Sequence, residues 1–453
     1  MGKARDYRSE DILRDGGSIV VRAIAPDDKE KLRDHFGRLS RTSVYRRFFN
    51  VKKQLRGDEL AHFTELDFVR RVGLVATLIE GGAEHIIGVG RFDVDRDEPR
   101  RAEVAFAVAD DHQGRGIGTL LLDHLVPIAR ALGVTEFRAD VLDDNAPMLK
   151  VFGDSGFAIE RALDGGIVTV TFPTGATPTY AEASLAREEH STAQSMRAIL
   201  APRSVAIVGA SRDPASIGGA LLRNVRASFH GPIYPVHATA ADVDGLRAWP
   251  SVGAIGASVD LAVIAVPAAA VEGVVEDCAA AGVHGLVVVS SGFGEVSAVG
   301  RDVERRLRAR VRASGMRLVG PNCLGVLETD PVRGVNATFA PGVPPVGTIA
   351  MLSQSGALGL AILDHVRARG LGVSSFVSVG NKADVSSNDL LAYWKDDPRT
   401  AVILLYLESF GNPRKFARIA PDVARRKPVI AVKSGRSAAG VRALYAAPEE
   451  QAS

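Results

Sequence analysis

Cysteine is almost absent from this chain of 453 residues, which contains only Cys278 and Cys323. Two thiols can build neither a disulfide scaffold nor a cysteine-rich zinc site, and they suggest a reducing compartment. A surplus of one charge is missing as well, because 55 Lys and Arg residues stand against 53 Asp and Glu residues. This balance argues against a globally basic nucleic-acid clamp and against an acidic tail protein.

Long apolar runs are also missing. Residues 1–17 are charged and contain no apolar core of a signal peptide. The apolar stretch 259–271 is broken by Pro267 and falls short of the roughly 18 residues that a membrane-spanning helix needs. We therefore expect a cytoplasmic protein with no membrane partner and no metal site, divided into about three domains at about 150 residues per domain.

The first 173 residues predict an α+β domain around a mostly antiparallel sheet. The Gly81-Gly82 pair between two apolar runs predicts a hairpin. Expected strands are 18–24, 72–79, 85–92, 101–108, 137–142 and 167–172, and expected helices are 26–40, 114–132 and 145–157. A linker is expected at 174–197, beginning as a loop, with later Ala, Glu and Arg residues that could form one helical turn or more.

Residues 198–340 and 341–453 repeat short apolar strands and helical stretches, a pattern typical of parallel sheets covered on both faces. Expected strands in the first region are 204–210, 232–236, 261–267, 285–291 and 317–321, and expected helices include 270–282 and 300–314. Expected strands in the second region are 347–353, 374–380, 401–408 and 428–435. Both regions are therefore predicted to be α/β domains.

A glycine-rich segment, Gln113–Gly118, lies between the expected strand 101–108 and the helix that follows it. Such a turn directs several backbone N–H groups to one point, where the helix dipole adds positive potential, and this suits a pyrophosphate. Arg115 could add a charge-assisted contact. The alternative is a tight turn that needs glycine only for its backbone.

Gln113–Gly118 resembles the pyrophosphate loop of the GNAT family of acyl-CoA-dependent N-acyltransferases, and the resemblance covers about residues 17–173. Asn145 resembles the asparagine beside the CoA arm, and 148–157 resembles the family's fourth motif. The resemblance implies acetyl-CoA or another short acyl-CoA as cosubstrate, held between two splayed parallel strands. The implied binding residues are Val108, near which a backbone N–H would stabilise the oxyanion, and Gln113, Gly114, Arg115, Gly116, Ile117, Gly118 and Asn145.

Acyl transfer to an amine requires a base, because a lysine ammonium with a pKa near 10.4 must first lose a proton. Glu103 is the candidate, because alternation along the strand places it on the face opposite Val104 and Phe106. The other reading is a solvated carboxylate beside Arg100 and Arg101. The segment 102–106 resembles the one that bears the catalytic glutamate in bacterial Pat-type protein lysine acetyltransferases, which favours the base, acting directly or through water. No residue is predicted as general acid.

The segment 40–49 follows the first helix and also resembles a stretch of Pat-type acetyltransferases. It could frame the acceptor site, although its aromatic residues are better explained by packing. Arg46 and Arg47 alone are too isolated to predict nucleic-acid binding.

Residues 205–219 and further segments such as 320–325 and 353–356 resemble the CoA-binding part of ADP-forming acyl-CoA synthetases, which are related to the succinyl-CoA synthetase α chain. The resemblance covers about 198–443 and implies a Rossmann-like CoA-binding domain at 198–340. It also implies a flavodoxin-like succinyl-CoA-synthetase-type domain at 341–453, expected to be incomplete. A second CoA or acyl-CoA could bind at Gly209, Ala210, Ser211, Arg212 and Gly218.

Synthetase chemistry is not expected from this chain. The resemblance expects a phosphorylated histidine shortly after the motif 434–440, near Ala447, and the sequence has no histidine beyond His365. The nucleotide-binding ATP-grasp half of the synthetases has no counterpart here, so the region is expected to sense CoA without catalysing thioester formation.

Together these features predict an acyl-CoA-dependent N-acetyltransferase. The arrangement resembles that of Pat-type enzymes, which implies a protein lysine as acceptor, on a metabolic enzyme such as an acyl-CoA synthetase. Two alternatives stay open: acetylation of a small amine, and a non-catalytic acyl-CoA sensor or α-like part of a two-chain ADP-forming synthetase.

Overall fold

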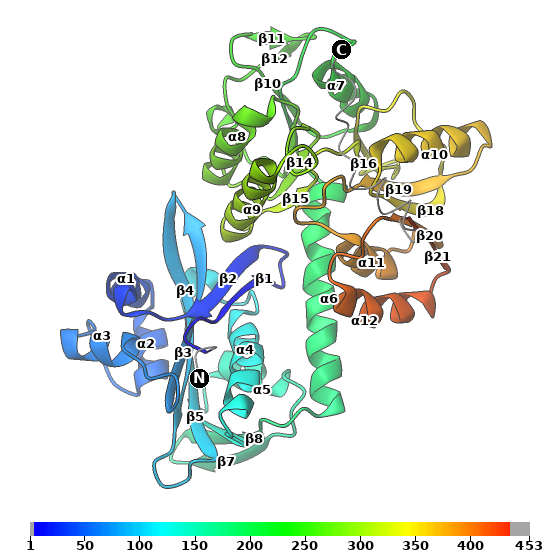
Figure 1. Ribbon diagram of the computed structural model, residues 1–453. Helices are drawn as coiled ribbons and strands as arrows, with labels where there is room; N and C mark the ends of the chain where they lie inside the picture. Colours follow the sequence, from blue (N-terminus) through cyan, green and yellow to red (C-terminus); the bar gives the residue numbers. More distant parts are fainter. Residues whose placement is uncertain (1–3, 435–453) are drawn as a thin grey trace. The chain divides into compact units, whose positions relative to one another are not determined.

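The computed structural model describes residues 4–434, and the chain divides into two compact units, Met1–Ser191 and Thr192–Ser453. The first unit is built on one eight-stranded sheet with the order β1-β2-β3-β4-β5-β6-β8-β7, seen in Figure 1. Its strands are β1 (Arg8–Ile12), β2 (Ser18–Ala23), β3 (Arg71–Glu80), β4 (Ala83–Val94), β5 (Arg101–Val108), β6 (Glu136–Leu142), β7 (Glu160–Asp164) and β8 (Ile167–Pro173).

The strand pair that matters most for function is β5 with β6. It is parallel and paired only over 101–103 and 136–138, whereas the other neighbouring strands described in this sheet are antiparallel. Beyond Glu103 the two strands diverge, while β6 continues to pair with β8 to its end at Leu142. The mostly antiparallel sheet and the splayed parallel pair are both confirmed.

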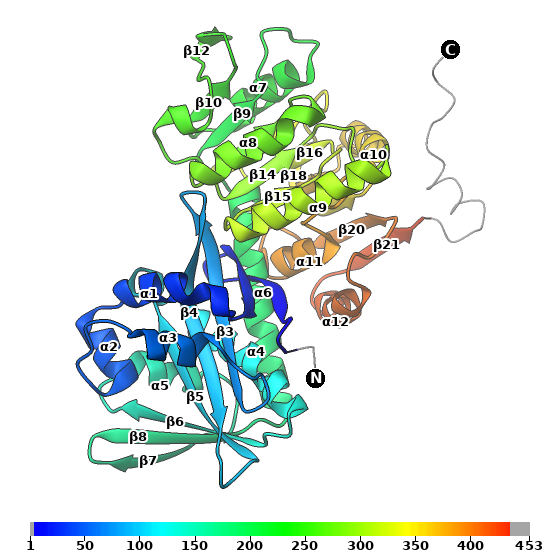
Figure 2. The same ribbon diagram turned by 60° about the vertical axis from the view of Figure 1, so that its left-hand side comes forward.

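Helices cover both faces of this sheet. Figure 2 shows α1 to α3 on one face and α4 on the other. The helical elements are η1 (Pro26–Asp28), α1 (Lys29–Gly37), α2 (Arg41–Phe48), α3 (Gly57–Thr64), η2 (Asp110–His112), α4 (Ile117–Ala131), α5 (Ala146–Gly153) and α6 (Pro178–Leu200). Buried Phe106 of β5 contacts Phe152 of α5, with ring centroids 6.2 Å apart. This contact fixes α5 beside the divergent end of β5.

Several element boundaries differ from the prediction. Helix α4 begins at Ile117 and not at 114, because Gly114 and Gly116 hold positive φ angles of 77° and 89°, which an α-helix does not contain. The expected helix 26–40 is split into η1 and α1, and the expected helix 145–157 ends at Gly153. The expected linker 174–197 lies largely within α6, a helix of 23 residues.

The second unit begins with a parallel five-stranded sheet of order β10-β9-β13-β14-β15. Its fully buried, four-residue apolar strands agree with the expected doubly wound layout. The elements here are β9 (Val205–Val208), α7 (Ile217–Ser228), β10 (Ile233–Val236), β11 (Asp242–Val243), β12 (Leu246–Arg247), η3 (Gly253–Ile255), β13 (Leu261–Ile264), α8 (Ala268–Ala280), β14 (Gly285–Val288), α9 (Ala298–Ala313) and β15 (Arg317–Val319).

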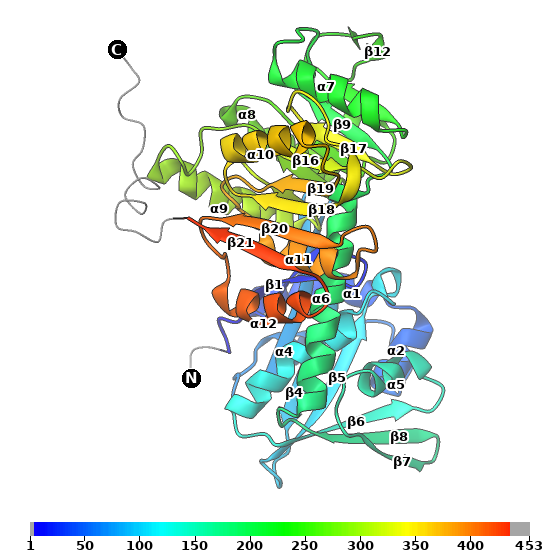
Figure 3. The same cartoon turned by 90° about the vertical axis from the view of Figure 1, so that its right-hand side faces the viewer.

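A six-stranded sheet of order β17-β16-β19-β18-β20-β21 follows. Figure 3 shows α10 on one side of it and α11 and α12 on the other. The elements are β16 (Gly325–Glu328), β17 (Val335–Thr338), β18 (Val346–Ser353), α10 (Gly356–Ala368), β19 (Val373–Ser378), α11 (Ser387–Asp396), β20 (Val402–Leu407), α12 (Pro413–Ala424) and β21 (Val429–Lys433). The unpredicted strands β16 and β17 fall within 198–340, yet β16 pairs with β19 of this sheet.

Two predictions concern residues outside this description: most of the motif 434–440 and the histidine position near Ala447. Among the described helices, none combines the length and apolarity required to cross a membrane.

Candidate active site

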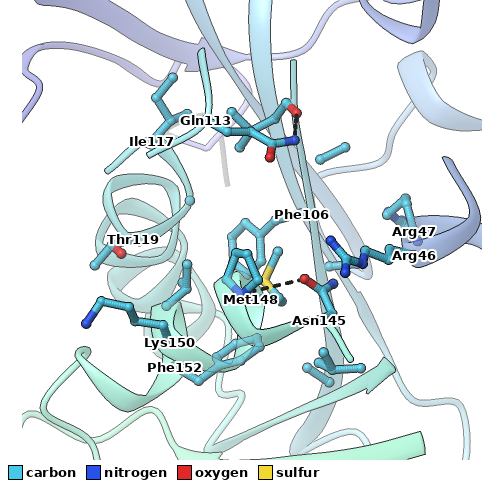
Figure 4. A pocket seen from close by; sticks show the side chains of 18 of the residues that line it. Arg46, Arg47, Phe106, Gln113, Ile117, Thr119, Asn145, Met148, Lys150 and Phe152 are labelled. Carbon is cyan, nitrogen blue, oxygen red and sulfur yellow. Dashed lines mark hydrogen bonds between the residues drawn. The ribbon is translucent and has the colours of Figure 1, made fainter. Parts of the chain in front are cut away.

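The first unit contains a cavity of about 290 Å³ where β5 and β6 diverge. The cavity is lined by residues of α2, β5, β6 and α5, together with the glycine loop and the first turn of α4. Figure 4 shows the side chains of Arg46, Arg47, Phe106, Gln113, Ile117, Thr119, Asn145, Met148, Lys150 and Phe152 around it. The structure therefore brings the predicted strand, loop and asparagine to one site.

The glycine loop leaves the first N–H groups of α4 available to a ligand. Gly116 is the N-cap of α4, and no side chain caps the helix there. Gln113 braces the loop, because its Nε2 donates to the Val108 carbonyl at 3.2 Å and to Asp110 Oδ1 at 3.2 Å. Gly114, Gly116, Ile117 and Gly118 all line the cavity. An uncapped helix start with two left-handed glycines is a suitable cradle for a pyrophosphate.

The edge of β5 supplies further backbone donors. The Ala109 N–H donates to the Ile87 carbonyl at 3.0 Å, toward β4. Because backbone groups alternate along a strand, the N–H groups of Val104, Phe106 and Val108 point to the opposite edge, into the gap toward β6. An extended pantetheine arm could accept hydrogen bonds there, while the role of the Val108 N–H at the oxyanion stays a prediction.

Asn145 and Arg115 have partners within the protein. Asn145 is buried, caps α5 by accepting from the Met148 N–H at 3.3 Å, and lines the cavity. Arg115 does not line the cavity, since its Nε donates to Asp15 Oδ2 at 2.5 Å and its Nη1 lies 2.6 Å from His112 Nδ1. The predicted contact of Arg115 with a phosphate would require this arrangement to change.

The cations that line the cavity were not selected from the sequence as CoA-binding residues: Arg14, Arg46, Arg47 and Lys150. Arg46 Nη2 donates to the Asp144 carbonyl at 3.0 Å, and Lys150 Nζ lies 2.8 Å from Asp154 Oδ2. Arg14 is next to the loop, because a Cβ on Gly116 would lie 3.5 Å from the Arg14 Cβ. Arg14 thus adds positive charge beside the glycine loop, which suits a phosphate, whereas Arg46, Arg47 and Lys150 line other parts of the cavity wall.

Glu103 lies on the cavity wall with an exposed carboxylate, while Val104 and Phe106 on the opposite face are buried. The predicted alternation is therefore confirmed. Across the β-ladder Glu103 faces Asp93 of β4 and Arg138 of β6. No hydrogen bond or ion pair joins Glu103 to any residue within 4–434. The role of Glu103 as the base stays a prediction.

The second unit contains a larger cavity of about 670 Å³, lined by residues that include Ile217, Glu295, Cys323, Lys382 and Glu408. Burial lowers the pKa of Lys382, although nearby Glu408 opposes this, and Lys382 Nζ donates to the Ser409 carbonyl at 3.0 Å. Cys323 is buried and its pKa is raised to about 12 by burial, so the thiol stays protonated at neutral pH, which agrees with a packing role.

At two positions of the predicted second CoA site, the structure explains why the residue is glycine. Gly209 holds a φ of 88°, and a Cβ on Gly218 would lie 1.9 Å from the Gly209 carbonyl oxygen, so α7 packs directly on the loop. Ala210 is buried, and Ser211 Oγ accepts from the Asp213 N–H at 3.1 Å. None of Gly209, Ala210, Ser211, Arg212 and Gly218 is among the lining residues of the 670 Å³ cavity. A CoA contact at these residues stays a prediction.

Comparison with known families divides the chain into three parts. Residues 42–157 match the acetyltransferase (GNAT) family, residues 203–329 match a CoA-binding domain, and residues 346–452 match the succinyl-CoA-ligase-like flavodoxin domain. The predicted fold class, a GNAT domain followed by Rossmann-like and flavodoxin-like domains, is confirmed. The predicted enzyme class, a GNAT-family acyltransferase, is supported by the same match.

Individual relatives resemble different parts. The alpha subunit of ADP-forming acetate–CoA ligase I of Pyrococcus furiosus is 42% identical over 254 residues, 55% of this chain and 54% of the relative. The acetyltransferase Pat of Mycolicibacterium smegmatis is 35% identical over 157 residues, 35% of this chain and 46% of the relative. The solved acetyl-coenzyme A synthetase 1 of Candidatus Korarchaeum cryptofilum has a TM-score of 0.53 and 44% identity, covering 55% of this chain and 53% of that one. The chain thus spans about half the length of these relatives.

Proposed function

We propose that this chain is an acyl-CoA-dependent N-acetyltransferase that transfers acetyl groups from acetyl-CoA to lysine side chains of proteins. The observation that carries the proposal is the free carboxylate of Glu103 on the wall of a cavity that the uncapped start of α4 closes. The reaction needs hydrogen-bond donors that bind the phosphates of CoA, here the N–H groups at the start of α4, and a base that takes a proton from the amine, here Glu103.

The reaction follows from these groups. Glu103, directly or through water, takes a proton from the lysine ammonium, and the neutral nitrogen attacks the thioester carbonyl. The backbone N–H of Val108 would donate to the oxyanion, since it points into the gap between the strands. The CoA thiolate then leaves with the bonding electrons of the C–S bond and takes up a proton. We assign no residue to that last proton transfer.

Similarity to Pat of M. smegmatis over 157 residues supports a protein acceptor rather than a small amine. By the same comparison we expect the arrangement of Pat-type enzymes and an acceptor among metabolic enzymes such as acyl-CoA synthetases. Neither nucleic acid nor a membrane enters this proposal.

The second unit is proposed to bind CoA or acyl-CoA as a sensor without forming thioesters itself. The synthetase resemblance expects a phosphorylated histidine near Ala447, where the sequence has none. The 42% identity with a ligase alpha subunit favours a second candidate function, the α-like part of a two-chain synthetase. Nucleotide-dependent thioester formation after addition of an ATP-grasp partner would support that candidate.

The acetyltransferase proposal is tested with Glu103→Gln in the full chain. Purified protein, acetyl-CoA and a lysate that lacks the enzyme are incubated, and acetyl-lysine sites are mapped by mass spectrometry. We expect the variant to lose about 10²–10⁴-fold in rate, the usual contribution of a general base, while acetyl-CoA affinity is retained. Glu160→Gln, at an exposed position of β7 away from the cavity, is the matched control. Full activity of Glu103→Gln would refute the assigned base.

A further inference from the structure

Two side chains of opposite charge line the acetyltransferase cavity without a hydrogen bond or ion pair to any residue within 4–434: Glu103 on β5 and Arg47 on α2. Arg47 makes no hydrogen bond and no ion pair with any residue within 4–434, and its guanidinium carbon lies 5.2 Å from the Phe48 ring centroid. Arg47 also borders a second, apolar cavity of about 50 Å³ beside Ala105 and Ala107. It therefore stands between the CoA cavity and the region covered by α1 to α3.

The neighbouring arginines are paired, which sets Arg47 apart. Arg46 bonds to the Asp144 carbonyl at 3.0 Å, and buried Arg91 forms an ion pair with Asp93 at 2.7 Å. Burial lowers the pKa of Arg47 to about 10, and Arg91 acts in the same direction, whereas Glu103 and Asp93 oppose it. Arg47 remains a cation at neutral pH. A half-buried guanidinium without a hydrogen-bonded partner loses hydration, and the Phe48 ring together with the charges of Glu103 and Asp93 offsets only part of that loss.

The missing partner of Arg47 can be narrowed by its position. The phosphates of CoA belong at the glycine loop, whereas Arg47 lies beside the β5 face of Ala105 and Ala107. Glu103 shares that face. A planar guanidinium binds a carboxylate through two parallel hydrogen bonds. The pair of free charges, one acidic and one basic, mirrors a substrate that carries an amine and a carboxylate close together.

We propose that Arg47 is a specificity-determining residue that binds a carboxylate of the substrate whose amine meets Glu103. The inference rests on the proposed function, because that function assigns the amine to Glu103. Two sources can supply this chemistry: the acceptor itself, or the acyl group of a dicarboxylic acyl-CoA. Because Arg47 of α2 lies beside the face of β5 that also carries Glu103, we favour a carboxylate of the acceptor over one of the acyl group.

The test compares probes that differ only in the carboxylate, using the full chain and thiol release. L-Lysine is compared with cadaverine, a peptide with one lysine beside glutamate is compared with its glutamine analogue, and succinyl-CoA is compared with propionyl-CoA on cadaverine. We expect kcat/KM to favour the carboxylate in at least one pair by about tenfold, the size of one charge-assisted hydrogen bond. Arg47→Gln should bring that ratio close to one, and Arg47→Lys should keep part of it.

The control is Arg41→Gln, an exposed position on the same helix that lines neither cavity; its ratio should equal that of the wild type. Thermal unfolding checks that each variant folds, and Arg47→Gln should be at least as stable as the wild type if Arg47 serves a ligand. Absence of a carboxylate preference in every pair, or a preference that survives Arg47→Gln, overturns the inference.

Binding separates this result from the fate of the proposed base. Calorimetry on Glu103→Gln measures the binding of the amine probes in the presence of acetyl-CoA, and the affinities of succinyl-CoA and propionyl-CoA are measured directly. Tighter binding of a carboxylate probe supports the inference even if turnover is absent, and equal or undetectable binding in every pair counts against it. If Glu103→Gln is fully active while Arg47→Gln loses the preference, the assigned base fails and the inference on Arg47 stands.

Discussion

Replacing Gly116 by alanine tests the backbone conformation of the glycine loop without introducing a steric clash. Gly116 holds a φ of 89°, and the nearest atom to an added Cβ is the Arg14 Cβ at 3.5 Å, an ordinary contact. The methyl group therefore meets no clash. The cost is that of a left-handed backbone in a residue with a side chain, about 1–2 kcal/mol.

This strain energy lowers either the free energy of unfolding or the affinity for acetyl-CoA. If the loop keeps its conformation in the variant, the free energy of unfolding falls by about 1–2 kcal/mol and acetyl-CoA affinity is unchanged. If the loop relaxes, stability is retained and the ligand must restore the conformation, so that Kd rises by about 5- to 30-fold. We expect the two losses to add up to about 1–2 kcal/mol, because they share one source.

Gly133→Ala is the matched control. Gly133 holds a φ of 84° with no atom within 4 Å of an added Cβ, follows the end of α4, and does not line the cavity. Its whole cost should appear as stability, about 2–4 °C in Tm per kcal/mol. Thermal unfolding and acetyl-CoA calorimetry on both variants decide the matter. Equal loss of affinity in both variants, or a Gly116→Ala variant unchanged in both measurements, would refute a loop that binds through its left-handed backbone.

Two further predictions concern stability. Acidification from about pH 6.5 toward 4 should destabilise the first unit, because burial lowers the pKa of His35 to about 4 and protons then bind preferentially to the unfolded chain. Urea unfolding should show a contribution that approaches about 1.4 kcal/mol per pH unit and is absent in His35→Gln; identical pH profiles would contradict it. Arg317→Met should cost the second unit about 3–5 kcal/mol, because it leaves buried Asp389 without the guanidinium that donates to it at 2.8 Å. Denaturant midpoints measure this loss against exposed Arg305→Met, and equal midpoints would show that the buried ion pairs contribute nothing.

The parts of the site that follow one another along the chain could be predicted from the sequence. Strand, glycine loop and helix are consecutive, and the alternation that exposes Glu103 and buries Phe106 is a local property of an extended chain. The starting residue of α4 could not be predicted in this way, because Gly114 and Gly116 are equally compatible with a helical and a left-handed backbone. Strands β1 and β7 were missed because RSEDI and ERALD have no apolar alternation.

Contacts between distant segments were beyond reach of such patterns. The place of Arg115 in the loop predicts a phosphate contact, which stays a prediction, but it could not predict that Arg115 donates to Asp15, 100 residues earlier. Similarly, β16 and β17 lie within a region read as one domain and pair into the next sheet, because strand pairing depends on the register of β16 with β19. Nothing in the local composition of 325–338 encodes that register.

Arg47 and Glu103 show most clearly what a sequence cannot predict about a site. The sequence shows that Arg47 and Glu103 are charged. It does not show that they lack a hydrogen bond or ion pair among the described residues, because this depends on which segments become neighbours in the fold. Arg46, Arg91 and Arg115 are equally charged and bind groups of the protein itself. Within the part of the chain that the structure describes, Arg47 and Glu103 form no hydrogen bond or ion pair, and on our proposal they meet opposite charges of a substrate. The proposed acceptor chemistry therefore rests on charged groups near the cavity that lack a hydrogen bond among the described residues.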